Sequence, residues 1–241
     1  MKNLGPKPMI YPMPVLILAS YDKDGKANAM NAAWGGIVEA DQICISLSKH
    51  QTTDNIDLNK AFTVSIADVE HTVACDYVGL VSGKDEPEKM KKAGFTTRKS
   101  EFVNAPVINE LPLCLECELL RIDGESAKDE MHYIGKIVNI CADEKILDGS
   151  GNVDLTKFHP ICYDPSGHGY YELGKKVGQA FADADLLPEH VCLLHVAGGD
   201  DAQCAGIGAG GSEFAGGDVG HAALDDGELG PQDFVQFFHV E

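Results

Sequence analysis

Hydrophobic and polar positions in the first half of the chain alternate in short runs, a pattern typical of β-strands. Residues 42–48 are the clearest case, because Ile43, Ile45 and Leu47 alternate with smaller or more polar residues. The apolar run 14–20 also has the length of a strand, and residues 62–67 predict another. The pattern therefore favours a protein built mainly from strands.

Turn signals separate these strands. Asp22-Lys-Asp-Gly25 predicts a hairpin turn, from which residues 26–34 return as a strand of small and polar residues. Something other than side-chain packing is expected to cover that strand. Gly35-Gly36 allows a bend or a close approach of the backbone. Residues 113–122 and 132–141 predict a long hairpin across Asp123-Gly124.

Helices are expected at three places. Thr52 or Thr53 is a good N-cap for a short helix that runs to about Lys60, and residues 71–79 predict a helix ended by Gly79. A last helix is expected to begin near residue 171 or 175 and to end near residue 184. Residues 82–100 are charged and rich in turn signals, so they predict an irregular segment at the surface of the protein. Since strands dominate without strand-helix alternation, a β-barrel or sandwich with peripheral helices is favoured over a parallel α/β fold.

Charge divides the chain into two regions. Of 38 acidic and 19 basic side chains, residues 183–241 hold 12 acidic and no basic ones, together with 11 of the 26 glycines. They predict a loosely ordered, acidic and glycine-rich C-terminal extension. Residues 1–182 have 26 acidic and 19 basic side chains, a net charge of −7, and are long enough for one domain. The net charge of −19 for the whole chain argues against nucleic-acid binding.

The sequence also bears on location. No apolar run approaches the roughly 20 residues of a membrane span, and the N-terminus lacks the apolar stretch of a signal peptide. We therefore expect a cytoplasmic protein with no membrane association.

Eight cysteines are spread through apolar surroundings, which favours reduced core thiols over a disulfide scaffold. Cys114 and Cys117 have the spacing of a redox or zinc half-site. They lie in a predicted strand, however, where residues three apart point to opposite faces. His190, Cys192 and His195 lack a fourth ligand at zinc spacing. We therefore predict no metal site.

A phosphate site is suggested where strand 42–48 runs into the helix start. His50, Thr52, Thr53 and Asn55 gather there, and backbone N–H groups at the positive end of a helix favour an anion. The neighbouring small-residue strand, which leads into Trp34, offers a flat surface for a planar ring. The alternative is that the two threonines only cap the helix and the small residues pack under another strand. The residues alone leave both open.

A family resemblance favours the ligand site. Several short sequence segments resemble, in the same order along the chain, segments of the flavin reductase-like family and specifically of its flavoredoxin branch. The first are Pro14-Val-Leu-Ile-Leu-Ala-Ser20, Asp24-Gly-Lys-Ala-Asn-Ala-Met-Asn-Ala-Ala-Trp34, Ile45-Ser-Leu-Ser48, Thr52-Thr-Asp-Asn-Ile56, Phe62-Thr-Val-Ser-Ile66, Asp76-Tyr-Val-Gly79 and Ser82-Gly83. Phe102-Val-Asn-Ala-Pro106, Leu115-Glu-Cys-Glu118, His132-Tyr-Ile-Gly-Lys-Ile137 and Tyr170-Tyr-Glu-Leu-Gly174 follow. The resemblance covers about residues 8–182.

The resemblance implies a Greek-key split β-barrel that binds FMN non-covalently, in homodimers that place the flavin near the subunit interface. The strand before the glycine pair would border the isoalloxazine ring through Asn28, Met30, Asn31, Ala33 and Trp34. The next strand would reach the ring edge and ribityl chain through Ser46, Leu47 and Ser48. The phosphate would be held by His50, Thr52 and Thr53. Ser82 and Lys89 would be further contacts, with Lys91 and Lys92 as rivals to Lys89.

The chemistry follows from the flavin. A flavin carries the redox reaction itself, so no general acid, base or nucleophile is nominated. The expected reaction is hydride transfer from NADH or NADPH to bound FMN and then to an acceptor. The alternative is a flavoredoxin-type electron carrier, whose acidic surface would suit a basic redox partner protein. Haem binding is disfavoured because no axial ligand is suitably placed.

Overall fold

The computed structural model describes residues 1–124 and 130–180, and Met1–Lys175 form one compact unit. The acidic extension proposed at 183–241 lies outside the described residues, as do His190, Cys192 and His195. A domain boundary at residue 182 therefore stays a prediction.

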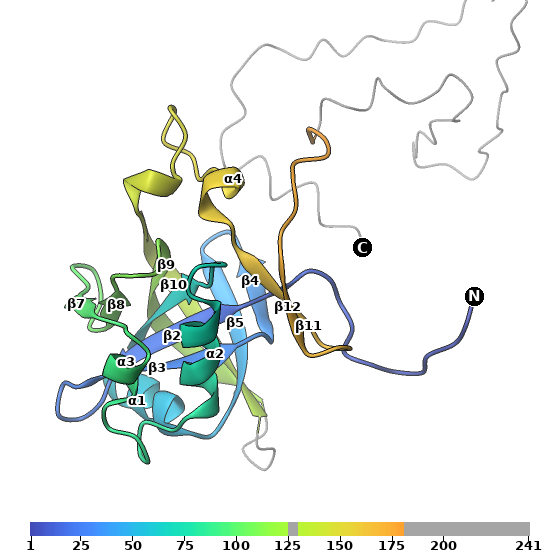
Figure 1. Ribbon diagram of the computed structural model, residues 1–241. Coiled ribbons are helices and arrows are strands. Elements are labelled where there is room, and N and C mark those ends of the chain that lie inside the picture. The colour runs from blue at the N-terminus through green and yellow to red at the C-terminus, as the bar shows by residue number, and fades with distance from the viewer. Residues whose placement is uncertain (125–129, 181–241) are drawn as a thin grey trace, which may run out of the picture. The chain divides into compact units, whose positions relative to one another are not determined.

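The elements of the compact unit follow one another along the chain (Figure 1). The strands are β1 (Met13–Pro14), β2 (Leu16–Tyr21), β3 (Ala27–Ala32), β4 (Gly35–Glu39), β5 (Gln42–Ser48), β6 (Ala61–Ile66), β7 (Thr97–Lys99), β8 (Pro106–Ile108), β9 (Leu113–Asp123), β10 (Glu130–Ala142), β11 (Ile161–Asp164) and β12 (Gly169–Glu172). The helices are α1 (Gln51–Asn59), α2 (Thr72–Leu80), α3 (Lys89–Lys92), the 3₁₀-helix η1 (Glu144–Ile146) and α4 (Leu155–Phe158).

One antiparallel sheet in the order β3-β2-β6-β9-β10-β5-β4 forms the body of the unit. Its two edge strands, β3 and β4, are consecutive in the chain and are separated by Ala33 and Trp34 alone. Two residues span at most about 10 Å, so the edges can be joined in this way only if the sheet curls until they approach each other. The sheet is therefore a barrel that is split between β3 and β4. The mainly β fold with a split barrel is confirmed.

The barrel is packed on both faces of its central strands. In β2, Leu16 and Leu18 lie in a buried cluster inside the barrel with Ile45 and Phe62, whereas Ile17 faces a second buried cluster. That second cluster includes residues of α2, which packs against β3. Burial on both faces explains why the sequence of β2 is an unbroken apolar run instead of an alternating one.

Two smaller sheets complete the unit. β1, β11 and β12 form a three-stranded antiparallel sheet, and β7 pairs with β8. The β11–β12 hairpin follows α4 and is drawn in yellow to orange in Figure 1. Its tyrosines reach the second buried cluster, in which Tyr163 and Tyr170 are partly buried.

Most of the predicted elements are confirmed. The hairpin turn at Asp22–Gly25 is present, with Gly25 at φ +77° and its N–H donating to the carbonyl of Asp22. β5 buries Ile43, Ile45 and Leu47 on one face, as predicted. The long hairpin exists as β9 and β10.

Three expectations about helices are wrong. The N-cap of α1 is His50, two residues before Thr52 and three before Thr53. Gly79 lies inside α2, which ends at Leu80. Tyr171 belongs to β12 and not to a helix, and no helix covers residues 173–180. The pairing of aromatic Tyr170 and Tyr171 with β11 outweighs their local sequence context, because aromatic residues favour half-buried strands.

Candidate functional site

A cleft of about 470 Å³ opens at the split of the barrel. The end of β3, the end of β5, helix α2 and the β11–β12 hairpin line it. Its volume lies in the range of small-molecule sites. Eight of the residues predicted for the site line this one cleft: Met30, Asn31, Ala33, Trp34, Ser46, Leu47, Ser48 and His50.

Aromatic side chains form one wall of the cleft. The ring centroids of Trp34 and Tyr163 are 6.1 Å apart, and those of Tyr163 and Tyr170 are 5.9 Å apart, both in tilted arrangements. The Tyr163 hydroxyl and His168 Nδ1 are joined by a hydrogen bond of 2.7 Å. Trp34 keeps 48% of its surface exposed, so its ring is available to a ligand. This wall can cover a planar aromatic group.

A polar network fixes Asn31 in the cleft. Asn31 Nδ2 donates to the carbonyl of Cys75 at 3.2 Å and to the Tyr170 hydroxyl at 3.3 Å. The Tyr170 hydroxyl in turn donates to Asp76 Oδ1 at 2.7 Å. Burial, followed by this bond to Asp76, raises the pKa of Tyr170, so its phenol stays protonated. The network holds the Asn31 amide in one orientation.

Helix α2 approaches β3 closely at Gly79. A Cβ atom at this position would lie 2.8 Å from Asn31 Cβ, which is too short for a real contact. The glycine therefore lets the helix pack against the strand that carries Asn31. Gly79 also lines the cleft.

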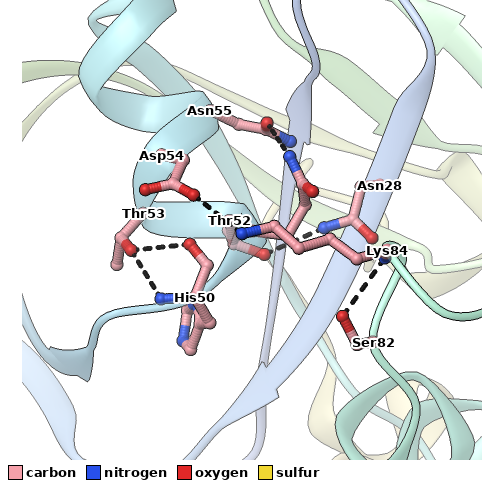
Figure 2. A network of polar contacts seen from close by, with 9 residues as sticks. Asn28, His50, Thr52, Thr53, Asp54, Asn55, Ser82 and Lys84 are labelled. Carbon is pink, nitrogen blue, oxygen red and sulfur yellow. Dashed lines mark hydrogen bonds and ion pairs between the residues drawn. The ribbon is translucent and has the colours of Figure 1, made fainter.

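The start of α1 reaches the cleft through His50, which lines it. Figure 2 shows the polar contacts of His50, Thr52 and Thr53 around this helix start. Thr53 Oγ1 accepts from the N–H of His50 at 2.9 Å and donates to the carbonyl of His50 at 2.8 Å. Thr52 Oγ1 accepts from Asn28 Nδ2 at 3.0 Å. Both threonine side chains are buried and neither lines the cleft. The Thr53 hydroxyl therefore closes the first turn of α1, as in the capping alternative, whereas the Thr52 hydroxyl joins the helix to Asn28 of β3.

Lys89 is buried behind this helix start, with 4% of its surface exposed. Its ammonium donates to the carbonyl of Val81 at 2.7 Å, and no ion pair includes it within the described ranges 1–124 and 130–180. Burial lowers the pKa of Lys89 to about 8. Burial also lowers the pKa of His50, and the nearby Lys89 ammonium contributes in the same direction. A positive charge without a carboxylate partner therefore sits close to the N-terminus of α1.

The two rival lysines differ from Lys89. Lys91 and Lys92 are exposed, and Lys92 forms an ion pair with Glu86. Only Lys89 among these three combines burial with the absence of an acidic partner in the described part of the chain. It is therefore the best placed of the three to meet an anion.

Asn28 and Ser82 stand apart from the cleft. Asn28 and Lys89 share a small cavity of about 40 Å³ with Gln51, and the buried Oδ1 atom of Asn28 has no hydrogen-bond partner among the described residues. Ser82 is exposed in the loop after α2, where its hydroxyl accepts from the N–H of Lys84 at 3.2 Å. The structure thus places Asn28, Thr52, Thr53, Ser82 and Lys89 outside the cleft lining.

The cleft lining includes residues that the sequence did not predict. The cleft also contains Asp76, Gly79, Leu80, Glu130, Tyr163, His168 and Tyr170. Asp76 and Tyr170 belong to sequence segments that resemble the family, so the family resemblance could have identified them as site residues. Tyr163 and His168 come from a hairpin that the sequence analysis did not predict.

Comparison with known proteins decides the family. The profile of the flavin reductase like domain matches residues 9–166. The chain belongs to the flavin reductase-like family. An uncharacterised protein of Aquifex aeolicus is 28% identical to it over 165 residues, which are 64% of this chain and 81% of that protein.

Solved structures of flavin reductase-like proteins have the same fold. Flavoredoxin of Desulfovibrio vulgaris superposes with a TM-score of 0.71 at 32% identity, over 76% of this chain and 98% of that chain. Flavoredoxin from Methanosarcina acetivorans gives 0.69 at 27% identity, over 78% of this chain and all of that chain. An FMN-binding domain of a flavin reductase-like enzyme from Shewanella baltica gives 0.59 at 18% identity, which shows the fold alone. The fold is that of FMN-binding split-barrel proteins.

Among the residues that the structure describes, no group of three or more histidine, cysteine or acidic side chains is placed to hold a metal ion. No described helix is both long and apolar enough to cross a membrane.

Proposed function

We propose that the cleft binds FMN non-covalently and that the protein is an NAD(P)H-dependent flavin reductase, which passes hydride to the bound flavin and on to an acceptor. The observation that carries this proposal is an aromatic cleft that reaches His50 at the N-terminus of α1, close to the buried ammonium of Lys89, which has no acidic partner among the described residues. The first feature suits a planar ring and the second suits a phosphate. The family assignment supports the same ligand.

The ring end of the site is assigned to β3 and β5. Met30, Asn31, Ala33 and Trp34 would border the isoalloxazine ring. Because Asn31 is held by Tyr170 and the Cys75 carbonyl, its free amide oxygen is positioned to accept a hydrogen bond from the ring edge. Ser46, Leu47 and Ser48, at the end of β5, would approach the ring edge and ribityl chain.

The phosphate end is assigned to the start of α1. The first backbone N–H groups of a helix have no partner within it and favour a negative charge. His50 lines the cleft at this point, and the Lys89 ammonium lies behind it. Thr52 and Thr53 would act here by fixing the helix start, and a shift of their side chains would be needed for direct contact.

The residues of this chain would hold and orient the flavin, whose own chemistry is the acceptance and release of electrons as hydride or singly. Trp34 and Tyr163 would limit access of water to one side of the ring. Asp76 and Tyr170 would keep Asn31 in place. We assign none of the side chains of the cleft as a general acid or base, because the flavin itself would carry the redox chemistry.

An electron carrier of the flavoredoxin type is the second candidate. It is favoured by the 32% identity to a flavoredoxin that the alignment covers almost completely. A carrier would exchange electrons with a partner protein, and the net charge of −7 on residues 1–182 would suit a basic partner.

Anaerobic stopped-flow spectroscopy separates the two candidates. For a reductase, mixing FMN-loaded protein with NADH or NADPH bleaches the flavin absorption within the turnover time. If both nucleotides fail to bleach it and dithionite succeeds, the reductase proposal is wrong and the carrier is supported. Bleaching by one nucleotide alone identifies the donor.

We also propose a homodimer. The edge strand β4 exposes 62% of Ile37 and 51% of Val38, next to the half-exposed Trp34. An uncovered apolar sheet edge invites pairing with another chain, and a second copy would cover it beside the cleft. A cytoplasmic location stays a prediction. The described cysteines are unpaired, as suits a reducing compartment.

A further inference from the structure

A second cluster of reactive groups lies far from the cleft. Glu130, which lines the cleft, begins β10, and Cys141 stands eleven residues further along the same strand. Eleven residues of strand extend over about 35 Å. The cluster around Cys141 is therefore separate from the proposed flavin site.

Three side chains form a row across neighbouring strands. Ser65 of β6 is paired directly with Cys114 of β9, and Cys114 is paired directly with Cys141 of β10. Residues directly opposite in antiparallel strands project to the same face of the sheet. Their Cα atoms lie about 4.5–5.5 Å apart, within the range of about 4.4–6.8 Å that a disulfide requires.

The two cysteines differ in their surroundings. Cys114 is buried, and its S–H group donates to the carbonyl of Leu115 at 3.7 Å. Cys141 is partly exposed, and the guanidinium of Arg98 donates to its sulfur at 3.5 Å. The β7–β8 hairpin brings Arg98 to this place, since β8 packs on β6.

These contacts favour a negative charge on Cys141. The neighbouring Cys114 thiol, and to a lesser extent the Arg98 guanidinium, lowers the pKa of the Cys141 thiol, although burial and the nearby Glu116 oppose it. The same interaction with Cys141 raises the pKa of Cys114, which remains a thiol. Thiolates, and not thiols, react with electrophiles, so Cys141 is the nucleophile of the pair.

Cys141 opens into a cavity of about 250 Å³. Arg98, Asn109 and Asp143 supply polar groups to it, and Val107 and Leu111 supply apolar ones. The cavity has room for a small molecule beside the sulfur. Cys114 is buried and is not among the residues that line this cavity.

We propose that Cys141 and Cys114 form a redox-active dithiol site, in which Cys141 reacts with small hydroperoxides and Cys114 then closes a cross-strand disulfide. The Cys141 thiolate attacks one peroxide oxygen, the O–O bond breaks, and the other oxygen leaves and takes up a proton. The Cys114 sulfur then attacks the oxidised sulfur, the S–O bond breaks, and water leaves with the Cys114 proton. With hydrogen peroxide, two thiols give up two electrons and both oxygens end as water.

The first test needs no variant. The reduced full-length protein is alkylated with limiting iodoacetamide at neutral pH, and the rate at each cysteine is read from its peptide by mass spectrometry. Cys44 and Cys162 are matched controls, because both are also partly exposed and unpaired. Cys141 should react at least about tenfold faster than either control. Equal rates would overturn the proposal.

The second test identifies the disulfide. After treatment with equimolar hydrogen peroxide, the peptide of Cys141 should appear linked to that of Cys114, and dithiothreitol should release it. In the C114S variant, dimedone should trap a sulfenic acid on Cys141. Linkage of Cys141 to Cys192 or Cys204 instead of Cys114 would contradict the assignment. If C114S does not fold, the exposed Arg98→Gln variant should still show slower alkylation of Cys141 alone.

Discussion

Lys89 is the residue on which the phosphate end of the proposed site depends most. Lys89→Met keeps the buried stem and removes the charge. Since a hydrogen bond to a charged group contributes about 1.5–3 kcal/mol, the Kd for FMN should rise roughly tenfold or more. The Kd for riboflavin, which lacks the phosphate, should stay unchanged. Fluorescence titration of both flavins measures the difference.

Lys91→Met is the matched control for this variant, because Lys91 is an exposed lysine of the same short helix. It should leave both affinities as they are. Equal weakening of FMN and riboflavin by Lys89→Met would place the phosphate elsewhere.

The same lysine predicts a pH dependence. Burial lowers its pKa to about 8, so free Lys89 loses its charge as the pH rises through about 8. A bound phosphate would raise that pKa, since an opposite charge favours the charged form. FMN affinity should therefore be constant from about pH 7 to 8 and fall by up to about tenfold per unit above it. Riboflavin titrated over the same range should show no such fall, and parallel curves would count against the assignment.

Among the elements, the contact between α2 and β3 decides the shape of the cleft. Helix propensity alone predicts that Gly79→Ala stabilises α2 by about 1 kcal/mol. The new Cβ would instead meet Asn31 Cβ at 2.8 Å, so the helix has to move. We expect a net loss of about 1–3 kcal/mol in urea unfolding, together with weaker flavin binding.

Gly36→Ala provides the control, because its Cβ would meet nothing within 4 Å. It should change the free energy of unfolding by less than about 1 kcal/mol, within the range usual for surface substitutions. If Gly79→Ala were as stable as this control, the close approach of α2 to β3 would be refuted.

Local pattern was sufficient to predict the elements that carry a strong period or turn signal. β5 alternates in the sequence as it does in burial, and the turn before β3 contains its glycine. The β11–β12 hairpin was missed because its strands are four residues each and its tyrosines are defined by packing on Trp34 and on β1. The outcome at Thr52 and Thr53 also depended on tertiary contacts, since the sequence allowed both a phosphate ligand and a cap.

The role of Lys89 in the candidate site likewise depends on tertiary structure and could not be decided from the local sequence. Its sequence neighbours Lys91 and Lys92 are identical in type, and only the fold buries one of the three. Asn31, by contrast, is predicted to lie in the site by the family resemblance, and it belongs to the strand of small residues that the sequence indicates as a surface for a planar ring. The residues of a strand indicate by themselves which surface the strand presents to a ligand. Long-range packing, by contrast, decides which of several lysines in a loop region comes close to that ligand.

At the scale of the whole molecule, the exposed edge strand β4 predicts self-association. Ile37→Lys places a charge in the middle of the apolar edge and should shift the protein from dimer to monomer in light scattering. Leu58→Lys is the control, because Leu58 is similarly exposed on α1, away from this edge. A wild-type protein that is monomeric at micromolar concentration would contradict the dimer.

The acidity of the chain belongs mostly to residues 183–241, which carry 12 acidic and no basic side chains. The domain that contains the cleft is only mildly acidic. The flavin site therefore has to be judged from its own residues. The charge of Lys89 is set against a net charge of −7 on residues 1–182, and not against the −19 of the whole chain.

The most direct test of the central claim is the flavin content of the purified full-length protein. We predict a yellow protein, or an apoprotein that takes up added FMN, with one FMN per chain and with release of unmodified FMN on denaturation. A colourless protein that leaves added FMN free after gel filtration would contradict the account.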